Sequence, residues 1–212
     1  MSGITSGTEL QQRLRTKLTE YDMYVLVDKT GSMDEPVKAG SSKSRWTYMQ
    51  ETLRDFTKFA CEIDDDGIVI GFFSGNQFPL HKNVTADQVD TILNQYKPGG
   101  GTVLAPALNQ MFREAQGSKK DLIIVFLDGE VNDPRETEAE LIAQANRQNS
   151  DNDCTVLFVQ VGDDTDAKRW LQTLDDNLTS KGAKFDIVDV KTVDEVSKFS
   201  SFEELLATAI TD

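Results

Sequence analysis

Cysteine, proline and histidine are scarce in this sequence, and their scarcity excludes several classes of protein. The 212 residues include 2 Cys, 5 Pro and 1 His. Two distant cysteines cannot form the disulfide framework of a small secreted domain, and neither has a neighbour that would complete a zinc site. We expect Cys61 and Cys154, which lie in apolar stretches, to be small buried hydrophobic residues.

Positive charge and long apolar runs are also scarce. The 22 Lys and Arg are outnumbered by 36 Asp and Glu, which gives a formal net charge of −14. Nucleic acids and anionic membrane surfaces attract basic footprints, so we expect neither as a partner. No apolar run approaches the roughly 20 residues that span a bilayer, and the first residues contain no apolar signal-peptide core. We therefore expect a cytoplasmic protein.

Apolar runs alternate with amphipathic segments along the chain. Runs without polar alternation are typical of strands that are covered on both faces, and they occupy residues 23–27, 68–73, 122–127 and 154–161. Residues 185–190 are expected to form a last strand. Helical periodicity is found at residues 45–63, 85–93, 104–115, 135–149, 167–174 and 202–210. This alternation predicts an α/β fold, a doubly wound sheet with helices on both faces.

Two further segments complete the expected organisation. Residues 77–82 alternate in polarity and contain Pro79, which favours a short antiparallel edge strand. Leucines spaced by four residues predict a short helix near the start of the chain. We expect a helical arm over residues 1–20 and one α/β domain over residues 21–212.

The polar segments that follow the apolar runs are the candidates for a functional site. They are D-K-T-G-S-M (28–33), G-G-G-T (99–102) and D-G-E (128–130). In an open parallel sheet, ligands bind beyond the carboxyl ends of the strands, where the strand order reverses. If the order runs outward from the first strand in both directions, Asp28 and Asp128 flank one crevice and Thr102 reaches over it.

The side chains of these segments offer only hard oxygen ligands. Asp28 and Asp128 supply carboxylates, and Thr30, Ser32 and Thr102 supply hydroxyls. Such a set selects Mg²⁺, Mn²⁺ or Ca²⁺ rather than Zn²⁺. Two carboxylates and neutral hydroxyls leave a divalent ion electrophilic, with a position open for water or for the carboxylate of a partner. These five residues are our predicted metal ligands.

Three motifs in this order resemble the von Willebrand factor A (VWA) domain family: D-K-T-G-S-M, G-G-G-T-V-L-A-P-A-L and F-L-D-G-E. The first is similar to that family's metal-ion-dependent adhesion site (MIDAS) motif, Asp-x-Ser-x-Ser, with Thr30 in place of the first Ser. The family's later threonine falls on Thr102 and its later aspartate on Asp128. The resemblance covers roughly residues 20–211.

The resemblance implies a Rossmann-like sheet of five parallel strands and one antiparallel edge strand. It also implies Mg²⁺ or a related divalent ion, and binding of a protein partner through its Asp or Glu rather than catalysis. We accordingly expect a monomer that is not an enzyme. The sequence is more similar to bacterial, cytosolic members, including those near tellurium-resistance and stress genes, than to secreted adhesins.

Other interpretations of the same motifs stay open. D-K-T-G-S also resembles the phosphorylated-aspartate motif of haloacid dehalogenase-like hydrolases, in which Asp28 would be the nucleophile and Asp128, Asn132 or Asp133 would hold Mg²⁺. The G-G-G-T block has no role in that scheme, and Thr30 stands where ordinary phosphatases have an acid/base carboxylate. The polar segments could also be capped turns, in which case Thr102 would cap its helix.

Overall fold

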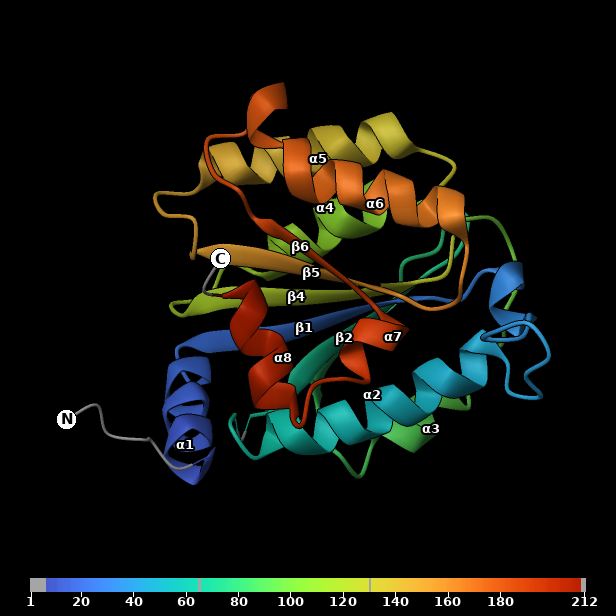
Figure 1. Ribbon diagram of the computed structural model, residues 1–212, viewed down its shortest axis with the longest axis horizontal. Helices are drawn as coiled ribbons and strands as arrows, with labels where there is room; N and C mark the ends of the chain where they lie inside the picture. The colour runs from blue at the N-terminus through green and yellow to red at the C-terminus, as the bar shows by residue number, and fades with distance from the viewer. Residues whose placement is uncertain (1–6, 65, 130, 211–212) are drawn as a thin grey trace.

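A single six-stranded sheet forms the centre of the computed structural model, which describes residues 7–64, 66–129 and 131–210 (Figure 1). The strand order is β3-β2-β1-β4-β5-β6. The strands are β1 (Tyr21–Asp28), β2 (Ile68–Phe73), β3 (Leu80–Val84), β4 (Lys120–Leu127), β5 (Cys154–Gln160) and β6 (Val188–Thr192). All neighbouring strands pair in parallel except β2 and β3, which are antiparallel. This topology confirms the predicted Rossmann-like sheet.

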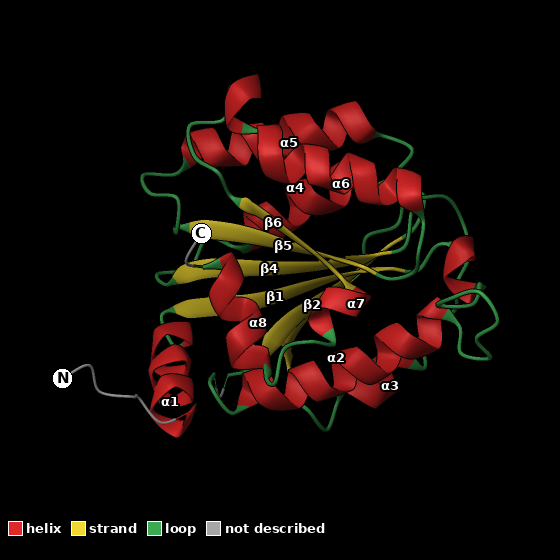
Figure 2. Cartoon of the chain, in the orientation of Figure 1, coloured by secondary structure: helices red, strands yellow, loops and turns green. Residues whose placement is uncertain are grey.

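Helices cover both faces of the sheet (Figure 2). On one face lie α4 (Ala105–Glu114), α5 (Pro134–Arg147) and α6 (Thr165–Asn177), and on the other lie α2 (Arg45–Cys61), α3 (Val89–Leu93), α7 (Val193–Val196) and α8 (Phe202–Ala209). Every residue of β5 is buried, as are all but the first of β4. Burial on both faces explains why these two central strands are rich in apolar residues, whereas the edge strand β6 is only partly buried and more polar.

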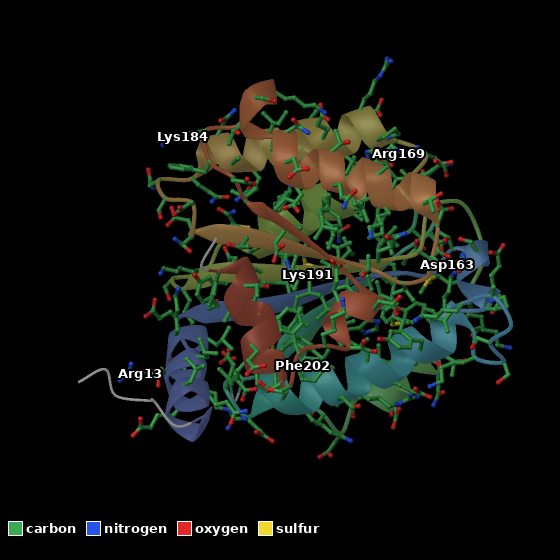
Figure 3. All side chains as sticks on the ribbon, viewed as in Figure 1. Arg13, Asp163, Arg169, Lys184, Lys191 and Phe202 are labelled. Atoms are coloured by element: carbon green, nitrogen blue, oxygen red, sulfur yellow. The ribbon has the colours of Figure 1, made fainter. Side chains whose placement is uncertain are left out.

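The first helix, α1 (Gly7–Leu18), lies beside α8 at one end of the sheet (Figure 1). Leu18 is fully buried, and Arg15 donates a 2.9 Å hydrogen bond to Glu203 of α8. Phe202, labelled in Figure 3, joins α8 to α2 through ring contacts with Phe56 and Phe59 at centroid distances of 5.6 and 5.4 Å. The expected arm begins with residues 1–6, which lie outside the described residues.

Several strand boundaries differ from the sequence prediction, most of all the starts of the edge strand and of the last strand. The edge strand begins at Leu80 rather than residue 77, because Ser74 and Gln77 close a turn through reciprocal backbone hydrogen bonds. The last strand begins at Val188 rather than residue 185, and it leads directly into α7. Thr192 and Glu195 cap α7 reciprocally, so a capping-box pattern that the sequence contains was overlooked.

The structure also bears on the cysteines and on membrane insertion. Both cysteines are free; Cys154 is buried, whereas Cys61 is only partly so. Over the described ranges, no helix combines the length and apolar character that crossing a membrane requires.

Candidate metal-binding site

The candidate site lies where β1 and β4 end side by side. These strands pair in parallel, with Val27 opposite Phe126, and the strand order reverses between them. Asp28 is the last residue of β1, and Asp128 directly follows β4. Residues a hundred positions apart therefore meet because the sheet grows outward from β1 in both directions.

A chain of hydrogen bonds links four of the five predicted ligands. The Thr30 amide donates to Asp28 Oδ1 at 2.7 Å, which folds the segment after β1 back onto its own carboxylate. The Thr30 and Ser32 hydroxyl oxygens are 3.2 Å apart, and the Ser32 hydroxyl donates to Asp128 Oδ1 at 3.1 Å. Carboxylates and hydroxyls from both strand ends thus converge in one place.

Burial makes this oxygen cluster electrostatically unusual. Asp28 is fully buried, and Thr30 and Asp128 are each 1% exposed. Loss of solvation, reinforced by the negative charge of Asp128 and opposed by hydrogen bonds from Thr30, raises the pKa of Asp28 to about 7. Burial also raises the pKa of Asp128, although Ser32 and Arg45 oppose the shift. Two neighbouring buried carboxylates are costly to ionise without a cation.

One oxygen of the cluster lacks a partner. Asp28 Oδ2 is buried and accepts no hydrogen bond from any residue that the structure describes. A buried carboxylate oxygen without a donor is expensive, and a small cation between Asp28 and Asp128 would satisfy it. The oxygen-only donor set and this orphaned atom fit a hard divalent ion.

Arg45 is part of the site, and sequence reasoning missed it. It is the first residue of α2, and its Nη1 lies 3.0 Å from Asp128 Oδ2 and 3.3 Å from Glu35 Oε2. The sequence places Arg45 at the start of an amphipathic helix, with no local signal that it would reach a residue 83 positions away.

The glycine-rich loop lies against both strand ends. The Gly99 amide donates to the Lys29 carbonyl at 2.8 Å, and the Gly31 amide donates to the Gly100 carbonyl at 3.3 Å. Gly100 has φ +88°, and a Cβ there would lie 2.3 Å from Ser74 Oγ, so a side chain fits neither the backbone nor the space. The loop is fastened beside the Asp28 turn.

Thr102, the fifth predicted ligand, stands apart from the other four. Its amide donates to Asn132 Oδ1 at 2.8 Å, and its carbonyl accepts from the Asn132 amide at 2.7 Å. Within the described part of the chain, no hydrogen bond joins the Thr102 side chain to the other four residues. The structure therefore brings the Thr102 loop to the segment after β4 but does not join its hydroxyl to the cluster.

Asn132 and Asp133 hold this loop and the helix after it. The two oxygens of Asp133 accept hydrogen bonds from the Leu104 and Ala105 amides at 2.9 and 2.8 Å, which caps the start of α4. Asp133, not Thr102, therefore satisfies the first amides of that helix. The phosphatase-like alternative gave Asn132 and Asp133 a role at Mg²⁺, whereas here both side chains bind backbone amides, and that alternative is not favoured.

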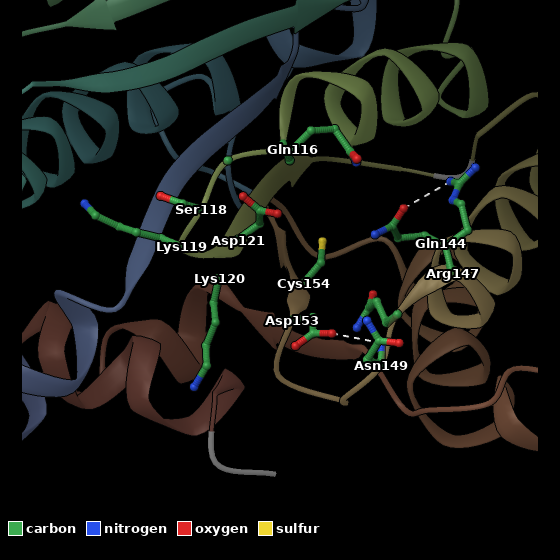
Figure 4. A pocket seen from close by; sticks show the side chains of 13 residues that line it. Gln116, Ser118, Lys119, Lys120, Asp121, Gln144, Arg147, Asn149, Asp153 and Cys154 are labelled. Atoms are coloured by element: carbon green, nitrogen blue, oxygen red, sulfur yellow. Dashed lines mark hydrogen bonds between the residues drawn. The ribbon is translucent and has the colours of Figure 1, made fainter.

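A pocket of about 400 Å³ lies at the opposite end of the strands, between the starts of β4 and β5 (Figure 4). Its lining differs from that of the candidate site because it includes lysine and arginine side chains and a cysteine. Figure 4 shows Lys119 and Lys120 pointing away from Cys154, and they pair with acidic residues elsewhere. Arg147 donates to Gln144 at 3.0 Å. Asp121 Oδ1 and Gln148 Oε1 at this pocket are also buried without a hydrogen-bond partner among the described residues. None of the three sequence motifs reaches this pocket, so the strand ends at Asp28 and Asp128 remain the stronger candidate.

Across the ranges that the structure describes, no group of three or more His, Cys, Asp or Glu side chains is arranged to hold a metal. The candidate centre has two carboxylates, and any further protein ligands must come from hydroxyls.

Comparison with known proteins identifies the family. The sequence profile of the von Willebrand factor type A domain matches residues 23–130, which include Asp28, Thr102 and Asp128. The match spans half of the chain, and the chain belongs to the VWA domain family. Domains of this family are commonly protein-interaction modules. No curated protein sequence matches the chain.

Solved structures share the fold at low sequence identity. A von Willebrand factor type A protein from Catenulispora acidiphila superposes with a TM-score of 0.56 at 16% identity, covering 90% of this chain and 42% of that one. Proximal thread matrix protein 1 from the mussel byssus gives 0.50 at 13% identity, covering 90% and 44%. The SpRpn10 VWA domain gives 0.49 at 13% identity, covering 88% and 93%. This chain thus spans less than half the length of the first two.

Proposed function

We propose that this VWA domain is a divalent-metal-dependent protein-binding module, with a MIDAS at the carboxyl ends of β1 and β4. The observation that carries the proposal is the buried pair Asp28 and Asp128, linked through Thr30 and Ser32, with Asp28 Oδ2 left without a partner among the described residues. Arg45 pairs with Asp128, and a divalent ion would compensate the charge that remains.

Each residue has a role in the proposed site. Asp28, Ser32 and Asp128 would hold the ion from both strand ends, and Thr30 would add its hydroxyl. Thr102 would contribute from the glycine-rich loop, which lies against the Asp28 turn through the Gly31 and Gly100 backbone. Mg²⁺ fits this oxygen set, with Mn²⁺ or Ca²⁺ as alternatives, and the bound ion would supply an electrophilic position for an incoming carboxylate.

The proposed partner is a protein that presents an Asp or Glu. A carboxylate is the ligand that an electrophilic divalent ion binds in preference to neutral groups. The chain itself carries a net charge of −14, so it repels acidic proteins in general. The bound ion would therefore attract an acidic residue at this one place on an otherwise negatively charged protein. This local attraction would make binding specific for a partner that presents its carboxylate there.

We propose binding rather than catalysis because, among the residues that the structure describes, Asp28 has no catalytic companion suited to phosphoryl transfer. The Thr30 side chain stands where an acid/base group would be needed, and Asp133 caps α4. For the cellular setting we propose the cytoplasm of a bacterial cell, in a stress or tellurium-resistance context. The two free cysteines support a reducing compartment.

Thermal unfolding with and without metal tests the proposal. Mg²⁺ or Mn²⁺ should raise the Tm of the protein progressively with concentration, because an ion that binds only the folded state stabilises it. Asp28→Asn should abolish the rise while leaving the metal-free Tm unchanged or higher, since it removes a buried charge.

Asp87→Asn is the matched control, because Asp87 is exposed and far from the strand ends. This variant should keep the full metal-induced rise. A rise that persists in Asp28→Asn would exclude the proposed site. Turnover of a phosphate ester that is lost in Asp28→Asn would instead favour the enzyme.

A further inference from the structure

The Arg45 guanidinium occupies the side of the candidate site nearest α2. Its Nη1 is 3.0 Å from Asp128 Oδ2, 3.3 Å from Glu35 Oε2 and 3.4 Å from the Ser32 carbonyl. One nitrogen thus serves three oxygens. Arg45 Nε is buried and has no partner among the described residues. The pairing uses a single nitrogen, in contrast to the two parallel hydrogen bonds of the strongest arginine–carboxylate pairs.

The backbone at Gly162 makes room for this arginine. Gly162 follows β5 and has φ +115°, and a Cβ there would lie 2.8 Å from Arg45 Nε and 3.3 Å from Cζ. A side chain at position 162 would therefore collide with the guanidinium. Arg45 is 9% exposed, so its charge acts on Asp128 through a medium that screens weakly.

The charge of Arg45 opposes that of a bound divalent ion. With both carboxylates ionised, Asp28 and Asp128 present two negative charges, and the guanidinium cancels one of them. It also contacts Asp128 Oδ2, while Ser32 contacts the other oxygen of the same carboxylate. A metal that binds Asp128 must therefore share this carboxylate with Arg45 or displace it.

Glu35 offers an alternative partner for the displaced guanidinium. Its carboxylate is already 3.3 Å from Arg45 Nη1, and its side chain is 63% exposed, whereas that of Asp128 is 1% exposed. A small movement away from Asp128 therefore keeps Arg45 paired.

We infer that Arg45 is a built-in counter-cation that competes with the divalent ion for Asp128, with Glu35 as its second position. This inference rests on the proposed function. Arg45 then sets the ion concentration at which the module becomes competent to bind its partner.

Calorimetric titration of the full chain with Mn²⁺ and with Mg²⁺ tests the inference. Arg45→Gln should tighten metal binding by about tenfold or more, because it removes a unit positive charge a few ångströms from the ion. Arg45→Lys keeps the charge and should stay within about threefold of the unmodified protein. Arg54→Gln is the matched control, because Arg54 is also on α2 but pairs with the exposed Asp90.

Glu35→Gln removes the alternative partner of Arg45 and leaves the buried pair of Arg45 and Asp128 unchanged. It should weaken metal binding in the unmodified protein by about threefold or more, because Arg45 loses its alternative partner. In the Arg45→Gln background the same change should have little effect, and this non-additivity distinguishes displacement of Arg45 from a general loss of negative charge.

The possible results are distinct. Equal or weaker metal binding by a folded Arg45→Gln protein would overturn the inference and leave the proposed function standing. An equal effect of Glu35→Gln in both backgrounds would also overturn it. If neither the unmodified protein nor any variant binds metal, the proposed function itself fails. Binding by Arg45→Gln at concentrations where the unmodified protein is still free would support both.

Discussion

Asp121 shows how burial, with the negative charges of Asp22 and Asp153 nearby, raises the pKa of a carboxylate. It lies near the start of β4, away from the candidate site, and is 7% exposed. Burial raises its pKa to about 7, opposed by a hydrogen bond with Tyr24. The folded protein therefore holds this proton more tightly than the unfolded chain does. The free energy of unfolding consequently falls as the pH rises from the ordinary pKa of an aspartate towards 7.

Asp121→Asn should remove this pH-dependent loss. We expect the variant to have a higher Tm than the unmodified protein at pH 8, by a few degrees, and little advantage at pH 3, where Asp121 is mostly protonated in both the folded and the unfolded state. Thermal unfolding across this range measures the effect. The exposed Asp87→Asn should show no such trend, and an advantage of the same size at pH 3 would contradict the assignment.

At the residue scale the sequence was informative where a motif or a strand end marked a residue. Asp28 and Asp128 could be placed together because parallel strands end at one edge of the sheet. Arg45 could not be placed beside Asp128 from the sequence, because the two residues are 83 positions apart. The residues around Arg45 have only the pattern of an ordinary helix start. Asp133 was assigned only to the phosphatase-like alternative, although an aspartate beside α4 and α5 can cap either helix.

At the element scale, the glycine-rich loop is fastened on both sides. On one side, the amide of Gly75, which follows β2, donates a 2.7 Å hydrogen bond to the Gly101 carbonyl. On the other side, Gly99 and Gly100 form backbone hydrogen bonds with the turn after β1. Glycines in a loop can allow either movement or a close approach of two backbones. The hydrogen bonds here show a close approach, and the positive φ at Gly100 identifies the glycine that this approach requires.

Gly100→Ala should therefore destabilise the protein, whereas Gly99→Ala should not. At Gly100 a methyl group would meet Ser74 Oγ, and the positive φ would be strained, so we expect a loss of about 2 kcal/mol. At Gly99, no described atom lies within 4 Å of the added carbon, which predicts no loss. Urea denaturation compares the two. Equal stability of the variants would show that the loop is not fixed as described.

The sequence predicted which helices and strands exist better than it predicted the residues at which they begin and end. β1, β2, β4 and β5 are largely buried and rich in apolar residues, so apolar patterning found them. The start of β3 was misplaced because the turn at Ser74–Gln77 depends on backbone hydrogen bonds that apolar patterning does not reveal. The start of β6, which is only partly buried, was also misplaced.

At the scale of the whole molecule, partner binding should depend on the ion and on the same carboxylates. Immobilised protein should retain a partner from a lysate of the source cell in the presence of Mg²⁺ and release it when a chelator is added. Asp28→Asn should retain none of it under either condition, whereas Asp87→Asn should behave like the unmodified protein. Retention that is indifferent to the chelator would contradict metal-bridged binding.

The strand order has a consequence for how the protein is made. The first half of the chain already contains Asp28, Ser32, Arg45 and the glycine-rich loop, but Asp128 and Asn132 come only with β4 and the segment after it. During synthesis, the Asp28 turn must wait for β4 to insert next to β1. Ion capture would therefore report that β4 of a newly made chain has paired with β1, and a chain without β4 would not bind the proposed partner.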